Sequence, residues 1–338
     1  MNCFDRSISG DVTIYEVAAH AGVSISTVSL ALNRPDRVGP PTRERVLRVV
    51  EELGFVPKAS AVARARRGAG RIGVLAPFTS YTSYHRRLRG VMEGLRGSGL
   101  DIVVYDHESA AESTAPLLSS LPLSRHLDGL LVMGLPLEPA TADRLAHSDL
   151  PAVLVDTDPL GFNAVTIDDE RAGWLVGRHL VDGGHARVAF VHEPQHSKAF
   201  ISQGQRRLAG LRRAYDEAGH PSGAVREVVV ANDIAGGRAA VAELRGASCS
   251  AAFAHHDLLA AGLLMQLRAD GVAVPDEIAV LGFDDGEVAE CLQLSTVRQP
   301  FEESGRVAAG LLREAVAGIS RSTQHISLAV ELVVRATG

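Results

Sequence analysis

Hydrophobic and polar positions follow two different periodicities along this 338-residue chain. Up to Leu53, apolar residues recur three and four positions apart, which is the spacing of one face of a helix. From Arg71 onward, short uninterrupted apolar runs alternate with segments of helical period. The change in hydrophobic periodicity predicts a small helical N-terminal domain followed by a larger α/β portion.

Local signals place two short helices near the start of the chain. Thr13 and Glu16 form an S/T-x-x-E capping box, which begins a helix. Gly22 can adopt the positive φ that ends this helix, and Ser24 can cap a second one. Two helices joined by a tight glycine turn predict a helix-turn-helix, whose second helix lies in the DNA major groove.

The apolar spacing also predicts which face of each helix is buried. Val17 and Ala21 share one side of the first helix, and Val28 and Leu32 of the second would pack against them. The opposite face of the second helix carries short side chains that could reach base edges: Ile25, Ser26, Ser29 and Leu30. Spacing alone leaves another interpretation open, an ordinary helical hairpin without a DNA role.

A third helix and a basic linker complete the N-terminal part. Residues 40–42, Pro-Pro-Thr, can open the helix because proline is tolerated in the first turn, and Gly54 can end it. Its apolar stripe consists of Val46, Val49, Val50 and Leu53. Residues 57–68 are alanine-rich and basic, with strong helix propensity but no face broad enough for a core. On these grounds alone the segment is interpreted as a flexible linker.

The remaining chain has the pattern of an α/β fold. Apolar runs predict strands at residues 72–76, 102–105, 129–133, 152–155, 188–191, 228–230, 251–253, 278–283 and 330–334. Helical segments lie between them, for example at about 84–97 and from Asp169 through Leu180. Such repetition predicts parallel sheets with helices on both faces. About 265 residues of this pattern is long for one sheet and comfortable for two.

Charge is distributed unevenly between the two parts. The whole chain has a formal net charge of −6. Residues 1–68 hold ten Lys or Arg and seven Asp or Glu, a net of +3, so the remainder carries −9. This asymmetry indicates that only the N-terminal part meets phosphates.

Nothing in the composition indicates export or a membrane. The first ten residues lack the apolar run of a signal peptide, and no stretch approaches the ~20 apolar residues of a membrane helix. Cys3, Cys249 and Cys291 are far apart and odd in number, which favours a reducing compartment over a disulfide framework. We therefore expect a soluble, cytoplasmic protein.

Three motifs match known cofactor-binding or metal-binding signatures but lack the structural context that those signatures require. The glycines of residues 68–73 match G-x-G-x-x-G but precede a strand, whereas a dinucleotide site needs them after one. Residues 192–196 match H-E-x-x-H, but Pro194 inside the motif prevents the helical face that zinc requires. His255, His256 and Asp257 lack a spaced further ligand and are interpreted as part of a ligand cleft. We expect no metal, no cofactor and no catalytic residues.

Several segments together resemble the lactose/galactose repressor (LacI/GalR) family of bacterial transcriptional regulators. They follow the family's order along almost the whole chain: residues 12–29, 42–46, 165–169, 183–190, 207–210, 281–285 and 296–300. The resemblance implies a periplasmic-binding-protein architecture, two sheet domains joined by three linkers with a ligand between them. It also implies a homodimer on near-palindromic operator DNA, because two-fold protein symmetry matches two-fold DNA symmetry.

The resemblance divides the chain into three parts. Residues 1–56 would be the DNA-binding head, and 57–70 a hinge helix that forms when two subunits bind DNA. Residues 71–338 would bind the effector and form the dimer. Within them the first subdomain would comprise about 71–165 and 298–322, and the second about 166–297 and 323–338.

Matching positions also imply an effector site. Arg207 stands where relatives have an arginine that binds effector hydroxyls or carboxylates. Asp284 stands where they have the hydrogen-bond acceptor that is paired with this arginine. An arginine and a carboxylate can each bind a vicinal diol with two hydrogen bonds, which suits a sugar; a structural ion pair is the alternative. Other positions implied to contact the effector are Tyr81, Tyr84, His256, Gln299 and Phe301. His256 replaces an asparagine common in relatives.

DNA contacts are implied along the helix-turn-helix and the hinge. In the head we expect them from Thr13, Tyr15, Ser24, Ile25, Ser26, Thr27, Ser29, Leu30 and Asn33. Relatives place a base-wedging leucine in the hinge, but here Arg64 occupies that position. We therefore expect Arg64 and Arg66 to enter the minor groove electrostatically, and Leu30 to contact a thymine methyl.

These observations favour a transcriptional repressor controlled by a small molecule. A sugar-binding transport protein would share the α/β part but would require export. An enzyme on the same fold would require a catalytic constellation, which the sequence lacks.

Overall fold

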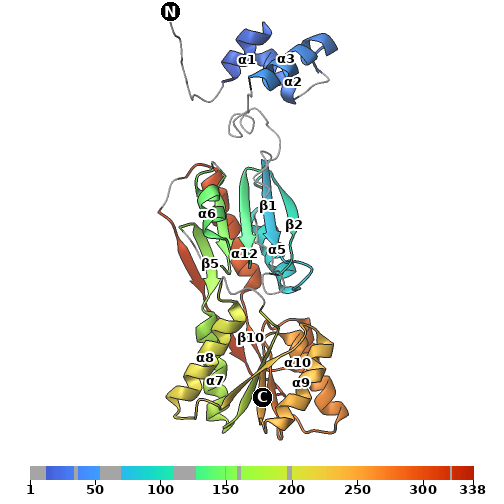
Figure 1. Ribbon diagram of the computed structural model, residues 1–338, viewed down its shortest axis with the longest axis vertical. Helices are drawn as coiled ribbons and strands as arrows, with labels where there is room; N and C mark the ends of the chain where they lie inside the picture. The colour runs from blue at the N-terminus through green and yellow to red at the C-terminus, as the bar shows by residue number, and fades with distance from the viewer. Residues whose placement is uncertain are drawn as a thin grey trace, which may run out of the picture. The chain divides into compact units, whose positions relative to one another are not determined.

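The computed structural model describes residues 13–33, 37–53, 70–109, 127–148, 150–157, 161–195, 200–319 and 322–338. The chain divides into two units, residues 1–68 and 69–338 (Figure 1). The predictions at Gly54, Arg64, Arg66 and His196 lie outside the described residues, as does the side chain of Asn33.

The first unit contains three helices: α1 Ile14–Ala21, α2 Ile25–Asn33 and α3 Pro40–Glu52. The capping box is confirmed, since the Thr13 amide donates to Glu16 Oε2 at 2.6 Å and the Glu16 amide to Thr13 Oγ1 at 3.4 Å. Gly22 ends α1 with φ 62°. The Thr27 amide donates to Ser24 Oγ at 3.1 Å, which caps α2.

One apolar residue from each helix is fully buried at the centre of this unit: Val17, Val28 and Val46. Ala21 and Val49 are also buried, while Leu32 and Leu53 pack against the cluster from its edge. The helical spacing therefore predicted the core of this unit correctly.

The second unit is built on two parallel sheets, and we call the halves around them the first and second subdomains. In the first subdomain, six described strands lie in the order β11-β5-β4-β3-β1-β2. Their bounds are β1 Gly70–Ala76, β2 Leu100–Asp106, β3 Gly129–Met133, β4 Ala152–Val155, β5 Asn163–Ile167 and β11 His325–Leu328. The helices are α5 Ser83–Gly94, α6 Pro139–Ala146 and α12 Phe301–Val316.

Both faces of this sheet are covered, and the buried strand β3 shows how. Leu131 and Met133 point to the side of α5 and α12, and Leu130 and Val132 point to the side of α6. A strand covered on both faces has no polar side, which explains its uninterrupted apolar sequence.

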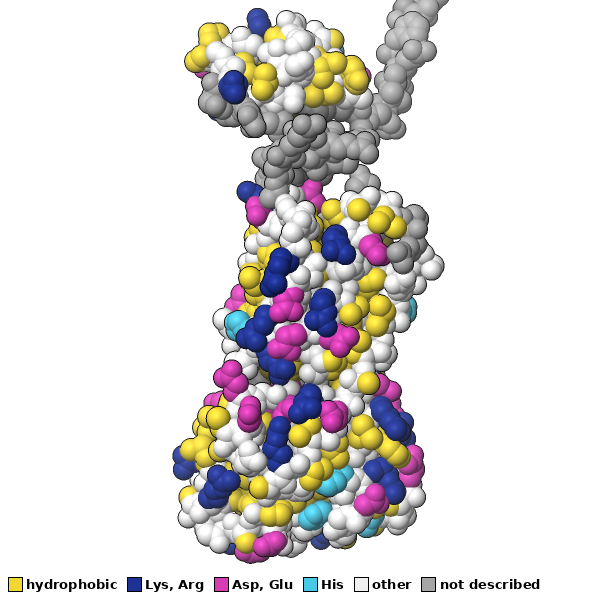
Figure 2. Space-filling view, turned by 180° about the vertical axis from the view of Figure 1, so that it is seen from behind, with side chains coloured by type: hydrophobic (Ala, Val, Ile, Leu, Met, Phe, Trp, Pro, Cys, Tyr) yellow, Lys and Arg dark blue, Asp and Glu magenta, His cyan; other side chains and the backbone are white. Residues whose placement is uncertain are grey.

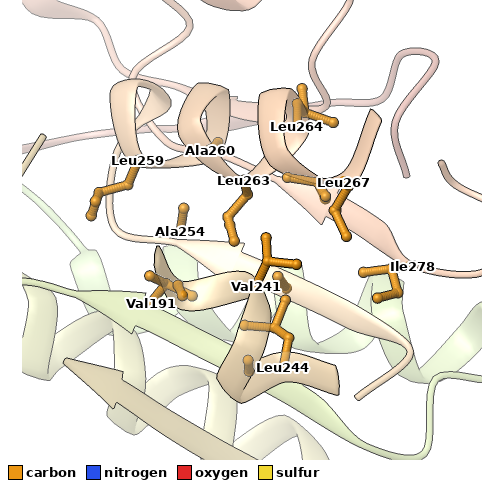
Figure 3. Packing of buried hydrophobic residues seen from close by; sticks show 14 of the residues in the cluster. Val191, Val241, Leu244, Ala254, Leu259, Ala260, Leu263, Leu264, Leu267 and Ile278 are labelled. Carbon is orange, nitrogen blue, oxygen red and sulfur yellow. The ribbon is translucent and has the colours of Figure 1, made fainter. Parts of the chain in front are cut away.

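The second subdomain has a four-stranded parallel sheet in the order β7-β6-β8-β9. The strands are β6 Val188–His192, β7 Val225–Val229, β8 Ala251–Ala254 and β9 Ala279–Leu281. The helices are α7 Asp169–Asp182, α8 Gln203–Glu217, α9 Ile234–Gly246, α10 Asp257–Ala269 and α11 Glu287–Leu292. Figure 3 shows Leu259, Leu263 and Leu267 of α10 above Val241 and Leu244 of α9, within the core on that face.

The chain crosses between the two subdomains three times, and the third crossing lies at a different position in the sequence from the one expected. Residues 323–338 were predicted to lie in the second subdomain, but β11 pairs with β5 at the edge of the first sheet. The crossing falls after β11, because only β12 Glu331–Val333 returns to pair with β10 Thr296–Arg298. The alternating, half-buried sequence of β11 lacks the apolar run on which strand prediction relied.

On the face shown in Figure 2, acidic and basic side chains of the second unit are intermixed. No helix among the described residues is long and apolar enough to cross a membrane.

Candidate effector site and DNA-reading helix

A cleft lies between the two subdomains, at the carboxyl ends of strands from both sheets, which is where open parallel sheets place their ligands. We call it the interdomain cleft. The first subdomain contributes Tyr81, Ser83, Tyr84, Arg87, Ser109, Gly134 and Asp156. Ile167, at the end of β5, also belongs to the first subdomain. The second subdomain and the crossings contribute Asp169, Glu193, Phe200, Ser202, Gln203, Gly204, Arg207, His255, His256, Asp284 and Gln299.

Arg207 on α8 is buried and held from several directions. Its Nε donates to Asp169 Oδ1 at 2.8 Å, and its Nη1 donates to the His255 carbonyl at 2.8 Å. The guanidinium lies 3.5 Å from the centroid of the Phe283 ring. Burial raises the pKa of Asp169 to about 6, and the charge of Arg207 opposes that rise. Arg207 is therefore a cleft residue and a structural ion-pair partner at once.

A second buried arginine, Arg87 on α5, was not predicted. Its Nη2 donates to the Asp156 carboxylate and, at 3.3 Å, to Gln299 Oε1. The guanidinium stacks over the rings of Phe301 at 4.4 Å and Tyr84 at 5.1 Å. Phe301 was expected in the site, but it does not line the cleft and is 1% exposed. Its place under Arg87 makes it a support for the cleft wall.

Two tyrosines of the first subdomain reach the cleft. The Tyr84 hydroxyl lies over Gly134, where an added Cβ would overlap it, and Gly134 has a φ of 63°, so the position favours glycine. Burial raises the pKa of Tyr84. The Tyr81 hydroxyl donates to the Glu193 carboxylate of the second subdomain, and burial followed by the charge of Glu193 raises its pKa well above its ordinary value. Tyr81 thereby joins the subdomains across the cleft.

Asp284 follows β9 and is held in an unusual backbone conformation, with φ 117°. Its Oδ1 accepts from Gln299 Nε2 at 2.7 Å, and burial raises its pKa to about 6. Gln299 thus connects Asp284 of the second subdomain to Arg87 of the first. Strained backbone at a polar, buried position is typical of functional sites.

His256 caps α10. Its Nδ1 accepts from the amides of Leu258 at 3.2 Å and Leu259 at 3.4 Å, which leaves Nε2 to donate to Asn232 Oδ1. Burial and then the charge of Arg207 lower its pKa to about 4. His256 is therefore neutral at pH 7, with its tautomer set by these bonds.

Asp257 lies beside the cleft residues without lining the cleft. Its Oδ1 accepts from Thr296 Oγ1 at 2.7 Å and its Oδ2 from the Gly286 amide at 2.9 Å. Burial, and next the charge of Asp284, raise its pKa to about 8. The carboxyl group connects the start of α10 with the loop after β9 and with β10.

The structure brings together Tyr81, Tyr84, Arg207, His256, Asp284 and Gln299. Sequence reasoning missed four charged residues of the cleft whose side chains are buried: Arg87, Asp156, Asp169 and Glu193. One signal was available for Asp156 and Glu193, since each is the first residue after a buried strand. His192, which belongs to the H-E-x-x-H match, lies with its Nε2 3.0 Å from Glu227 Oε1.

On α2, three side chains expected to read DNA are exposed: Ile25, Ser26 and Leu30. Ser24 and Thr27 bond each other at 2.8 Å, so their hydroxyl groups take part in the cap. Tyr15 on α1 is 68% exposed, and Figure 2 shows hydrophobic side chains at the surface of this unit. Apolar groups held in water at a helix-turn-helix are suited to contact base methyl groups.

Comparison with known sequences agrees with this arrangement. Residues 13–58 match "Bacterial regulatory proteins, lacI family", and residues 178–337 match "Periplasmic binding protein-like domain". The transcriptional regulator CelR of Thermobifida fusca is 32% identical over 342 residues, covering 96% of this chain and 98% of CelR. The repressor PurR of Vibrio parahaemolyticus serotype O3:K6 is 30% identical over 343 residues, with the same shares covered.

Solved structures show the same fold over nearly the whole chain. A CelR–cellobiose complex has a TM-score of 0.68 at 30% identity and covers 97% of this chain and 100% of its own. The lac repressor dimer bound to operator and the anti-inducer ONPF has a TM-score of 0.68 at 25% identity, with 97% and 99% covered.

A helix-turn-helix unit joined to a two-subdomain binding fold defines a DNA-binding transcriptional regulator controlled by a small molecule. The chain belongs to the LacI family of bacterial regulatory proteins.

Proposed function

We propose that this protein is a cytoplasmic repressor that binds a near-palindromic operator as a homodimer, and that a sugar or sugar derivative in the interdomain cleft sets its operator affinity. The observation that carries the proposal is the meeting of Arg87 and Tyr84 from one subdomain with Arg207 and Asp284 from the other. A ligand that contacts all four would fix the angle between the subdomains. It would act through its different affinities for the open and closed arrangements.

The chemistry of the cleft favours a ligand rich in hydroxyl groups. Arg87 and Arg207 are already paired with Asp156 and Asp169, so neither charge requires an ionic ligand. Guanidinium and carboxylate groups can still donate to and accept from neighbouring hydroxyls. Similar regulators support this class, since CelR was solved with cellobiose and a LacI-family regulator from Enterococcus faecium with ribose.

On the DNA side, we propose that α2 reads base edges with Ser26 and Leu30, and that the hinge arginines Arg64 and Arg66 enter the minor groove. Residues 1–68 carry ten basic side chains, which supply phosphate contacts. Each phosphate neutralised changes the slope of log affinity against log salt by about −0.9. The relatives are transcriptional regulators, and we propose that this chain likewise acts by binding rather than by catalysis.

The test combines operator binding with effector binding in the full-length protein. Fluorescence anisotropy on the palindrome beside its own gene should give tight binding that weakens steeply with salt. Thermal shift over a panel of sugars should find a ligand that changes this operator affinity. Asp284→Asn keeps an acceptor for Gln299 but removes the charge, so it should weaken sugar binding by about tenfold or more while operator binding without sugar persists. Salt-independent operator binding, or a bound sugar without effect on operator affinity, would contradict the proposal.

A further inference from the structure

The interdomain cleft continues into a second, larger space. We call the cleft described above the inner compartment, and the adjoining space the outer compartment. The outer compartment lies over the ends of β3, β4 and β5 and is lined by Gly134, Pro136, Asp156, Thr157, Thr166, Ile167, Asp169, Phe200, Ile201, Gln203 and Arg206. Six of these residues also line the inner compartment: Gly134, Asp156, Ile167, Asp169, Phe200 and Gln203. The two spaces are therefore neighbours that share one wall.

Asp156, Gln203 and Asp169 form the polar part of this shared wall. Asp156 follows β4 with a φ of 52°, in the left-handed region that non-glycine residues rarely adopt. In this conformation its carboxylate pairs with Arg87, while its carbonyl accepts from Gln203 Nε2 at 2.6 Å. Gln203 begins α8 in the second subdomain, so the bond crosses between subdomains. A strained residue of the shared wall thus contacts Arg87 in its own subdomain and Gln203 in the other.

The two compartments differ in chemistry. Arg87, Arg207 and Asp284 all face the inner compartment and none of them lines the outer one. The outer compartment instead gains Pro136 and Ile201, two threonine hydroxyls and the side chain of Arg206. Ile201 is 62% exposed, an apolar side chain left in water at the mouth of a ligand site. Such a surface gains free energy when an apolar ligand face covers it.

The compartments also differ in size. The free volume is about 70 Å³ in the inner compartment and about 180 Å³ in the outer one. A single water molecule needs roughly 10–15 Å³ of such free volume, so the inner compartment has room for only about five to seven waters. The larger part of the space available to a ligand therefore lies outside the inner compartment.

We propose that the effector is an extended sugar, a disaccharide or a glycoside. Its hydroxyl-rich terminal ring occupies the inner compartment, and its second ring or aglycone covers Ile201, Phe200 and Pro136 in the outer one. This inference rests on the proposed sugar-controlled function and adds the class of sugar and a residue that selects it. The terminal ring supplies the hydrogen bonds, and the second part supplies apolar burial.

The experiment measures matched ligand pairs by calorimetry on the full-length protein: glucose with cellobiose and with phenyl β-glucoside, and galactose with lactose and with phenyl β-galactoside. The extended member of the pair that binds should bind at least about tenfold more tightly than its monosaccharide. A tenfold gain corresponds to burying roughly 55 Å² more apolar surface.

Variants of Ile201 separate the two compartments. Ile201→Asp should remove most of the advantage of the extended sugar while leaving the affinity for the monosaccharide unchanged, and Ile201→Leu should retain that advantage. Ile319→Asp places the same change at another half-exposed isoleucine, outside both compartments, and should change neither affinity.

The possible failures are distinguishable. Equal affinities for a monosaccharide and its extended partners, or an Ile201→Asp variant that weakens both equally, would overturn the extended-sugar inference and leave sugar control standing. If no pair binds, or if bound sugar leaves operator affinity unchanged, sugar control fails and this inference fails with it.

Discussion

The DNA-reading helix α2 and the interdomain cleft differ in burial, in charge and in what holds their side chains in place. On α2, the residues proposed to read bases are uncharged and exposed, and they are oriented by a helix that Ser24 caps locally. In the cleft, the polar residues are charged and buried, and Arg87 and Arg207 are held by partners from other elements. The first surface is available before a ligand arrives, whereas the second is part of the folded core.

This difference has an energetic consequence. Exposed side chains on a helix can change with little effect on stability, usually within about 0.5 kcal/mol. Buried charges must keep their partners, because removing one partner leaves an uncompensated charge away from water. We therefore expect substitutions on α2 to change DNA specificity alone, and substitutions in the cleft to change folding and ligand binding together.

The largest effect is expected from Arg207→Met. The substitution leaves Asp169 buried without its cation, so the free energy of unfolding of the α/β unit should fall by about 3–5 kcal/mol at pH 7. Urea denaturation followed by circular dichroism measures it. Arg213→Met on the same helix removes an arginine whose side chain is 44% exposed and should cost less than about 1 kcal/mol. Equal losses in the two variants would erase the contrast between buried and exposed charges.

Leu30→Arg tests the other side of the comparison. An arginine on the exposed face of α2 should shift the preferred base at one symmetric pair of operator positions toward guanine, by about 1–3 kcal/mol, with stability almost unchanged. Selection of binding sites from a random operator library measures the shift. Leu47→Arg adds the same charge at a similarly exposed leucine of α3 and should strengthen DNA binding without changing the preferred base. A loss of folding in Leu30→Arg would show that α2 is not an independent reading surface.

The pH dependence of stability sharpens the comparison within the cleft region. The folded pKa of Asp257, about 8, lies above the unfolded value of about 3.9, so the folded state binds the additional proton. Stability from this group is therefore present at low pH and is lost as pH rises through 8. His256, with a folded pKa of about 4, acts in the opposite direction and only below about pH 6.5. Asp169 and Asp284, with folded pKa values of about 6, act in the same direction as Asp257 and only below about pH 6.

Between pH 6.5 and 8, the free energy of unfolding should therefore fall with a slope of up to about 1.4 kcal/mol per pH unit. Asp257→Asn keeps the shape of the side chain and removes the titration, so it should flatten the curve in this window. Urea titrations at half-unit pH intervals measure both proteins. A slope that survives in Asp257→Asn would assign the dependence to another group.

The smallest effect is expected from Thr13→Ala, which removes the cap of α1. Loss of such a cap costs about 1 kcal/mol, and Thr13→Ser should retain it. Amide hydrogen exchange of α1 in the full-length protein measures the change, and protection in the α/β unit should not alter. Unchanged protection of α1 would show that packing on Val28 and Val46, rather than the cap, determines its stability.

Much of the fold followed from the sequence because its signals are local. The buried strands β1, β3, β4 and β8 were predicted within two residues at each end, since strands covered on both faces are continuous apolar runs. Strands β5, β10 and β11 were not predicted as strands. They are short or partly exposed, and their pairing partners are supplied only by tertiary contacts.

What the sequence determined by itself was the helix-turn-helix and the alternation of strands and helices. Those features depend on contacts within a few residues of each other. The tertiary structure alone decided that Arg87 meets Asp156, 69 residues away, and Gln299, 212 residues away. It also placed Phe301 beneath Arg87 instead of in the cleft. Buried charges choose partners by proximity in the folded core, and no local pattern of the chain records that proximity.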